Sequence, residues 1–261
     1  MKLWTLLFIA FLLRAAGASY GLPHVYHQDE PMMVNHALAI GTGDWNTHYF
    51  VIPPFIHYLL FFMYGGIFVL GSVVRFFKSN TDFALLYLQD PTLFYFWGRL
   101  LVGAAFGTAT VALLYRLGQR FFSERIGWIA AVLLAVNYLH VQQSHYIYAD
   151  VAVTFAITLL CYCLLLAVEK PSMGAFLRAG IVFGWGVSVK YTAAYLLPAI
   201  LAAFWHAFGS RVWRPENIKK IAGMAAVSVA AFAVFAPYTF LDWASFVEAV
   251  YRQSQGGAFV G

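Results

Sequence analysis

Two adjacent carboxylates, Asp29 and Glu30, lie in the run HQDEPMM directly after the first apolar segment of the chain. The sequence has only 11 Asp and Glu in 261 residues, and 62% of it is hydrophobic. An acidic pair beside a membrane-length helix is costly unless water, a cation or chemistry requires it. At a helix start a carboxylate is favoured in its charged form, which can accept a proton from a hydroxyl or bind a cation. A plain helix cap is the alternative interpretation.

A third carboxylate, Asp150, ends the run HVQQSHYIYAD and precedes another apolar segment. His140, His145 and Asp150 are spaced five apart, so they do not share one helical face. A loop or a helix break must intervene if these three side chains converge. Asp150 also suits the cap of a helix that begins at Val151, and the two interpretations are compatible.

Two isolated cations, Arg99 and Lys190, stand at the ends of apolar segments. Each could neutralise a phosphate, and the arginine could do so through its planar fork of N–H donors. Snorkelling of the charged end to the membrane boundary is the alternative for both. The sequence places them at a matching depth, on the same side as the acidic residues, which favours the phosphate-neutralising role over snorkelling.

Three histidines, His24, His27 and His36, flank the acidic pair, and zinc commonly takes His and carboxylate ligands. The spacing of His24, His27 and Asp29 does not match a strong zinc motif. A divalent metal therefore stays open, and no other cofactor is assigned. Cys161 and Cys163 are two apart in an apolar segment, so they point in different directions and are expected to be unbridged core residues.

These residues must be positioned by membrane helices. Charged residues make up 10% of the chain, against roughly 25% in soluble domains. Several apolar runs approach the ~20 residues that span a bilayer as a helix, and they are continuous rather than alternating, which argues against a β-barrel. The sequence predicts an all-α, polytopic transmembrane helix bundle. Its apolar segments are 3–18, 54–74, 97–117, 127–143, 150–168, 178–189, 191–209 and 220–238.

The basic residues report topology rather than nucleic-acid binding, because they lie in short connections between apolar runs. The connections at 116–125 and 210–220, and the weaker one around Lys170 and Arg178, are predicted to be cytoplasmic. These three basic connections fall on the same side of the membrane only if segment 54–74 lies in the interface or re-enters the membrane without crossing it. The prediction is about seven spans in an integral membrane protein, with Asp29 and Asp150 on the outer face, in the inner membrane if the source is bacterial.

The longest outer loop, 19–96, should contain interfacial helices. Pro31 suits the first turn of one of them, and Gly41 and Gly43 suit its end. The N-terminus resembles a signal peptide, but an uncleaved first helix is preferred because Arg14 interrupts its apolar core. No repeat is visible, so 1–261 is predicted to be one transmembrane module. We expect the natural protein to continue past Gly261.

Five motifs in a fixed order resemble the GT-C superfamily of membrane glycosyltransferases. They are DEP, THYFVIPPFIHYL, the basic turn YRLGQRFFSER, WIAAVLLAVNYLHVQQSHYIYAD and FGWGVSVKYTAAYLLP. The nearest group would be the protein O-mannosyltransferases and the lipid A aminoarabinose transferases. The resemblance covers nearly the whole chain, although each motif alone is weak.

The resemblance implies transfer of a monosaccharide from a polyprenyl-phosphate carrier to an acceptor protein, lipid or glycan on the outer face. It implies an inverting reaction with an acidic residue as general base. The residues that match these roles are Asp29, Glu30 and Asp150 for catalysis, Arg99 and Lys190 for the donor phosphate, and His48, Tyr49 and His145 for the donor and acceptor pocket.

Two other functions stay open at this point. A multi-span transporter or flippase for a lipid or ion would also carry rare buried charges. Transporters commonly show two related halves and broken helices that meet at the midplane, whereas the acidic residues here lie at outer boundaries. A non-catalytic membrane scaffold is the third possibility.

Overall fold

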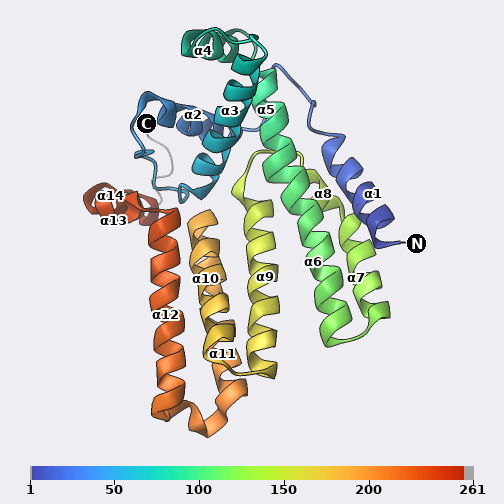
Figure 1. Cartoon of the computed structure of the whole chain (residues 1–261), viewed down its shortest axis with the longest axis vertical. Helices are drawn as coiled ribbons and strands as arrows, with labels where there is room; N and C mark the ends of the chain where they lie inside the picture. The colour runs from blue at the N-terminus through green and yellow to red at the C-terminus, as the bar shows by residue number, and fades with distance from the viewer. Residues whose placement is uncertain (1, 256–261) are drawn as a thin grey trace.

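The computed structural model describes residues 2–255, which form helices and no β-strand. Figure 1 shows long helices running side by side, with shorter helices gathered at one end of the bundle, the upper end in this view. The all-helical membrane architecture predicted from the sequence is therefore confirmed.

Five helices of the described residues are long and apolar enough to cross a membrane. They are α3 (Phe55–Val73), the continuous helix α5–η2–α6 (Thr92–Phe121), α9 (Ala149–Glu169), η3–α11–η4 (Tyr191–Trp213) and α12 (Pro215–Phe235). The internal bounds are α5 (Thr92–Gly98), η2 (Arg99–Ala105), α6 (Phe106–Phe121), η3 (Tyr191–Leu196), α11 (Leu197–Phe208) and η4 (Gly209–Trp213). Two further apolar helices are shorter, α1 (Leu3–Ala15) and α10 (Met173–Val189). The prediction of about seven spans stays a prediction.

One predicted segment, 127–143, is not a single helix. It forms α7 (Glu124–Ala135) and α8 (Tyr138–Gln143), with a break at Val136 and Asn137. The Asn137 side chain caps α8 by accepting a hydrogen bond from the His140 backbone N–H at 3.0 Å. The apolar pattern runs through this break, but the Asn137 cap starts a new helix there and competes with continuation of α7.

Arg14 stabilises the end of α7 from the neighbouring helix α1. Its guanidinium is fully buried and donates hydrogen bonds to the carbonyl oxygens of Leu134 and Ala135, at 3.1 Å each, and to His140 Nδ1 at 2.9 Å. Cations are favoured at helix C-termini, where the last carbonyls lack helical partners. Arg14 interrupts the first apolar segment in the sequence, and in the structure its charge joins α1 to the end of α7.

Glycines allow the closest helix contacts. A Cβ on Gly103 would lie 2.0 Å from the Ser144 carbonyl oxygen, and one on Gly184 would lie 2.0 Å from that of Ser228. The first contact seats the connection between α8 and α9 against η2, and the second packs α10 on α12. Any side chain at either position would clash, so glycine is what allows this close helix packing.

The first long connection folds into short helices at the upper end of the bundle. They are α2 (Glu30–Ala39), η1 (Ile40–Thr42) and α4 (Asn80–Gln89). Pro31 lies in the first turn of α2, and Gly43 follows η1 with φ +100°, as the sequence predicts. Figure 1 shows α3 above the ends of α9, α10 and α12 rather than alongside them, and α3 packs mainly on α2. This placement is compatible with the interpretation that 54–74 does not cross with the bundle, which stays a prediction.

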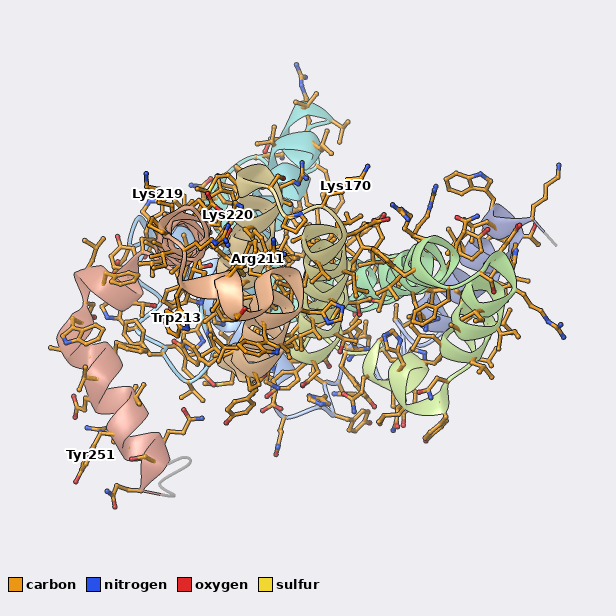
Figure 2. The ribbon with its side chains drawn as sticks, turned by 90° about the horizontal axis from the view of Figure 1, so that it is seen from below. Lys170, Arg211, Trp213, Lys219, Lys220 and Tyr251 are labelled. Carbon is orange, nitrogen blue, oxygen red and sulfur yellow. The ribbon has the colours of Figure 1, made fainter. Side chains whose placement is uncertain are left out.

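The basic turns lie at the opposite end of the bundle. Figure 2, seen from below, shows Lys170, Arg211, Lys219 and Lys220 around the lower ends of α9, α11 and α12. The chain therefore has two chemically different ends, one basic and one that carries the acidic residues described next. Two short helices complete that upper end, α13 (Tyr238–Leu241) and α14 (Trp243–Ser254).

Candidate active site

Asp29 occupies the N-cap position of α2, but its side chain makes no capping hydrogen bond. Its backbone N–H instead donates to His27 Nδ1 at 3.3 Å. The residue is half-buried, so the carboxylate is reachable and is not consumed by the helix. The cap interpretation is correct for the position of Asp29 and wrong for the use of its carboxylate.

Glu30, the next residue, is fully buried and faces Arg99, which is 2% exposed. Arg99 Nε and Nη2 donate to the two carboxylate oxygens of Glu30 at 2.8 and 2.7 Å. Arg99 Nη1 donates to the carbonyl oxygens of Ala18 and Tyr20 at 3.1 and 2.7 Å. This bidentate pair has the strong planar geometry that arginine and carboxylate favour.

The buried pair joins three parts of the chain. Arg99 opens η2, a π-helical stretch inside the helix 92–121, and Glu30 belongs to α2. Glu30 Oε1 also accepts a hydrogen bond from the Ile147 backbone N–H at 2.9 Å. Ile147 lies three residues before Asp150 in the second connection that carries acidic residues. The pair therefore fixes the spacing between the loops that hold Asp29 and Asp150.

Asp150 and Lys190 form a second ion pair, and this one is open. Lys190 Nζ lies 2.7 Å from Asp150 Oδ1, with the two side chains 21% and 44% exposed. Asp150 lies in the first turn of α9, and Lys190 caps the C-terminal end of α10. The ammonium group also lies 4.7 Å from the centre of the Tyr148 ring, a cation–π contact. An anionic ligand could reach this lysine.

Two tyrosines connect the two acidic residues. Burial, the neighbouring Tyr148 and the Asp29 carboxylate raise the pKa of Tyr49 to about 12. Burial, Asp29 and Asp150 raise the pKa of Tyr148 to about 12. Both phenols keep their protons at neutral pH, and both lie within electrostatic reach of Asp29. The structure therefore brings Asp29, Tyr49, Tyr148, Asp150 and Lys190 into one cluster.

Aromatic rings line this cluster. The His27 ring lies 4.4 Å from that of Tyr146 and 5.9 Å from that of Tyr148, and the His36 ring stacks on Tyr49 at 4.6 Å. Neither Tyr146 nor Tyr148 was assigned to the site from the sequence. The alternation in the run HYIYAD was the available signal, since it gives two tyrosines the same side of an extended segment.

Two predicted pocket residues have other contacts. His48 is exposed and pairs with Asp44 at 2.9 Å. His145 Nε2 lies 3.1 Å from the Leu13 carbonyl oxygen, and its ring covers Gly17. The His145 contacts fasten the second connection to the end of α1, which is a structural role. The described residues contain no group of three His, Cys, Asp or Glu that could hold a metal ion, so the flanking histidines do not assemble into a metal site there.

The fold and the cluster define a class of protein, a multi-helix membrane protein with carboxylates and a reachable cation at one end. Residues 93–240 match the family described as dolichyl-phosphate-mannose-protein mannosyltransferase. The match covers more than half of the 261 residues, so the chain belongs to this family of GT-C membrane glycosyltransferases. Neither the curated proteins nor the solved structures contain a match to the chain.

The family match covers Arg99, Asp150 and Lys190 and begins at residue 93, so Asp29 and Glu30 lie outside it. Membership establishes a glycosyltransferase that uses a polyprenyl-phosphate-linked sugar, and it favours an enzyme over a transporter or a scaffold. The roles of individual residues rest on the geometry above.

Proposed function

We propose that this protein transfers a monosaccharide from a polyprenyl-phosphate donor to a hydroxyl of an acceptor protein, lipid or glycan, with inversion at the anomeric carbon. The reaction would take place on the side of the membrane opposite the basic turns, which is the outer face if the positive-inside tendency holds. The observation that carries the proposal is the cluster around Tyr148, which has the Asp29 carboxylate, not used as a helix cap, on one side and the reachable Lys190 ammonium group over its ring.

Asp29 is the general base in this proposal. The acceptor hydroxyl attacks the anomeric carbon while its proton passes to the Asp29 carboxylate. The bond between that carbon and the phosphate oxygen breaks, and its electron pair leaves with the polyprenyl phosphate. Attack from the face opposite the leaving group inverts the anomeric configuration.

Lys190 stabilises the leaving phosphate, and Asp150 orients Lys190. The 2.7 Å contact holds the ammonium group at the Tyr148 ring before the donor arrives. A phosphate that binds there adds a second anion to the cation, and the charge on the leaving oxygen is offset as it develops. The protonated phenols of Tyr49 and Tyr148 can donate hydrogen bonds to sugar hydroxyls or to the phosphate.

We propose a positioning role for Arg99. The sequence assigned it to the donor phosphate, but its guanidinium is buried and engaged with Glu30 and two carbonyl oxygens. We therefore place Arg99 and Glu30 among the residues that position Asp29, rather than among those that touch the donor.

The test is transfer of radiolabelled sugar from polyprenyl phosphate by the whole chain reconstituted in membranes that supply native acceptors. Asp29→Asn should lower the rate by about 100- to 10,000-fold, the usual contribution of a general base. Asp44→Asn, an exposed carboxylate in the same connection, is the matched control and should retain the parent rate. Extraction of the label into protein, lipid or glycan fractions identifies the acceptor class.

If Asp29→Asn transfers sugar at the parent rate, Asp29 is not the general base. If the parent protein binds the donor but transfers no sugar to any fraction, the proposed reaction itself is wrong.

A further inference from the structure

The helix α14 has two chemically different faces. Its apolar residues recur with helical spacing and are Trp243, Phe246, Val247, Val250 and Tyr251. On a helix of 3.6 residues per turn these positions form one stripe. Glu248 and Arg252 lie on the opposite face and form an ion pair with each other.

Most of the apolar stripe is uncovered. Trp243 and Tyr251 are 56% and 64% exposed, and Val247 and Val250 are 44% and 43% exposed. Phe246 is the exception, because it packs 6.1 Å from the rings of both Phe50 and Tyr191. Among the residues that the structure describes, the stripe is therefore packed along one edge, at Phe246.

The helix lies across the bundle at its site-bearing end. Figure 2 shows α12 end-on and α14 along its length, with Tyr251 near its far end. Figure 1 places α13 and α14 beside the upper end of α12. α12 is long and apolar enough to span a membrane. The short segment between the end of α12 and the start of α14 consists of residues 236–237, then α13, then Asp242. A helix in this position lies at the level where the apolar span ends.

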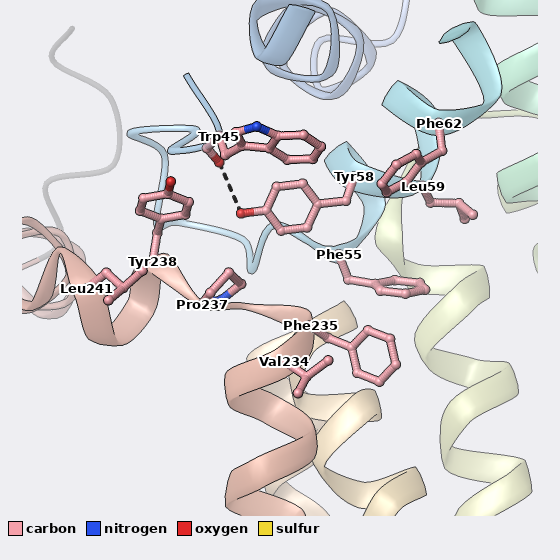
Figure 3. Close-up of a pocket in the computed structure, with 10 residues that line it drawn as sticks. All are labelled: Trp45, Phe55, Tyr58, Leu59, Phe62, Val234, Phe235, Pro237, Tyr238 and Leu241. Atoms are coloured by element: carbon pink, nitrogen blue, oxygen red, sulfur yellow. Dashed lines mark hydrogen bonds between the residues drawn. The ribbon is translucent and has the colours of Figure 1, made fainter. Parts of the chain in front are cut away.

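The surface beside α13, the helix that precedes α14, is apolar as well. An open groove of about 580 Å³ between α3 and the end of α12 is lined by aromatic and aliphatic side chains, shown in Figure 3. Four of these side chains are at least 44% exposed: Trp45, Phe62, Val234 and Leu241. The sole hydrogen bond drawn among the ten lining residues joins the Tyr58 hydroxyl to the Trp45 carbonyl oxygen at 3.1 Å. None of the ten described residues that line the groove is charged.

We propose that α14 is a membrane-interface helix whose apolar stripe sits in the boundary between lipid headgroups and acyl chains, on the side that carries Asp29 and Asp150. Lipid fits this surface better than protein for two reasons. The exposed stripe and the nearby groove offer apolar contact without charge, and the stripe contains a tryptophan and a tyrosine, the residues that are enriched at membrane boundaries. Glu248 and Arg252 then face water.

The helix is also fastened to the connection that carries Asp29. Asp242, at the N-terminus of α14, accepts a hydrogen bond from Asn46 Nδ2 at 2.8 Å and lies 3.9 Å from His48 Nδ1. His48 holds φ +50°, which is uncommon outside glycine, so this connection is constrained where it meets α14. A lipid-seated α14 would hold the first connection at a fixed height above the bilayer.

Single cysteines test the placement without reference to sugar transfer. In a Cys161→Ala/Cys163→Ala background, Val247→Cys and Val250→Cys sample the apolar stripe, and Ser245→Cys and Arg252→Cys are matched controls on the polar face. Each whole chain is labelled with an environment-sensitive fluorophore and reconstituted at one chain per nanodisc. Elution volume on size exclusion confirms that each variant is folded.

Brominated phospholipids should quench the labels at 247 and 250, with the strongest quenching at a depth of roughly 5–10 Å below the boundary. Aqueous iodide should quench the labels at 245 and 252 more than those on the stripe. Iodide quenching that is equal at all four positions would overturn the proposal. Labels at 247 and 250 that are shielded from both quenchers would also overturn it, because a protein segment would then cover the stripe.

Discussion

Two ion pairs at the same end of the bundle have opposite environments. Glu30–Arg99 is sealed, with side chains 0% and 2% exposed, whereas Asp150–Lys190 is open, at 44% and 21%. The sealed pair has its hydrogen bonds filled by the protein and links α2, η2 and the segment before Asp150. The open pair has room for a further anion. Burial therefore separates a pair that sets geometry from a pair that can meet a ligand.

The comparison also separates two neighbouring carboxylates. Asp29 and Glu30 are adjacent, yet the helix start at Asp29 turns one side chain toward the tyrosine cluster and the other into the core. A buried glutamate paired with arginine cannot change partners during a reaction without the large free-energy cost of an unpaired buried charge. The same ion pair holds the backbone of the neighbouring Asp29 in place.

Breaking the sealed pair should have the largest effect on stability. Arg99→Met leaves Glu30 buried and unpaired, and removing one partner of such a pair costs about 3–5 kcal/mol. Unfolding of the detergent-solubilised protein, followed by heat or denaturant, measures this loss. Much of the protein should fail to fold at growth temperature.

The double variant Arg99→Met/Glu30→Gln provides the control, because it removes both buried charges. It should be more stable than Arg99→Met alone, since the single variant leaves a buried charge uncompensated. Equal unfolding free energies for Arg99→Met and the parent would show that the pair contributes no net stability. Burial would then not distinguish the Glu30–Arg99 pair from the Asp150–Lys190 pair.

The sequence was sufficient for the parts that depend on local pattern. Rarity of charge in apolar surroundings pointed to Asp29, Asp150 and Lys190, and the structure brings these three to one end. Pro31 and Gly43 correctly bounded the first helical segment of the long connection. These features follow from hydropathy and from the backbone preferences of proline and glycine.

The sequence was insufficient where distant residues decide. Arg99 and Glu30 are far apart in the chain, and no local signal shows that they neutralise each other rather than a ligand. The break between α7 and α8 depends on Arg14 from another helix, although Asn137 was a visible cap residue. Apolar runs predict that a helix forms, and tertiary capping decides where it ends.

Changing the open pair should have a smaller effect on stability and a clear effect on the donor. Lys190→Gln should shift the unfolding free energy by no more than about 1 kcal/mol, as for partly exposed pairs. It should lower kcat/KM for the polyprenyl-phosphate donor by about 10- to 100-fold, because a charge-assisted hydrogen bond contributes about 1.5–3 kcal/mol.

Lys190→Arg keeps the charge and should retain most of that kcat/KM. Donor kinetics that are unchanged in Lys190→Gln would show that the lysine snorkels to the membrane boundary and does not contact the donor phosphate. A stability loss as large as that of Arg99→Met would show that the second pair is structural as well.

The smallest effect is expected at an ion pair far from the site. Arg120 and Glu169 join the lower ends of α6 and α9 at 2.7 Å and are 46% and 39% exposed. Glu169→Gln should cost about 0.2–1 kcal/mol, the range for solvent-exposed pairs, and the cost should shrink at high salt because mobile ions screen it. Sugar transfer should be unchanged, since the pair lies at the basic end of the bundle.

Unfolding measured at low and high salt provides the baseline for the other two pairs. If Glu169→Gln cost as much as Arg99→Met, then burial would not be what distinguishes the sealed pair, and the positioning role of Glu30 and Arg99 would need another physical basis.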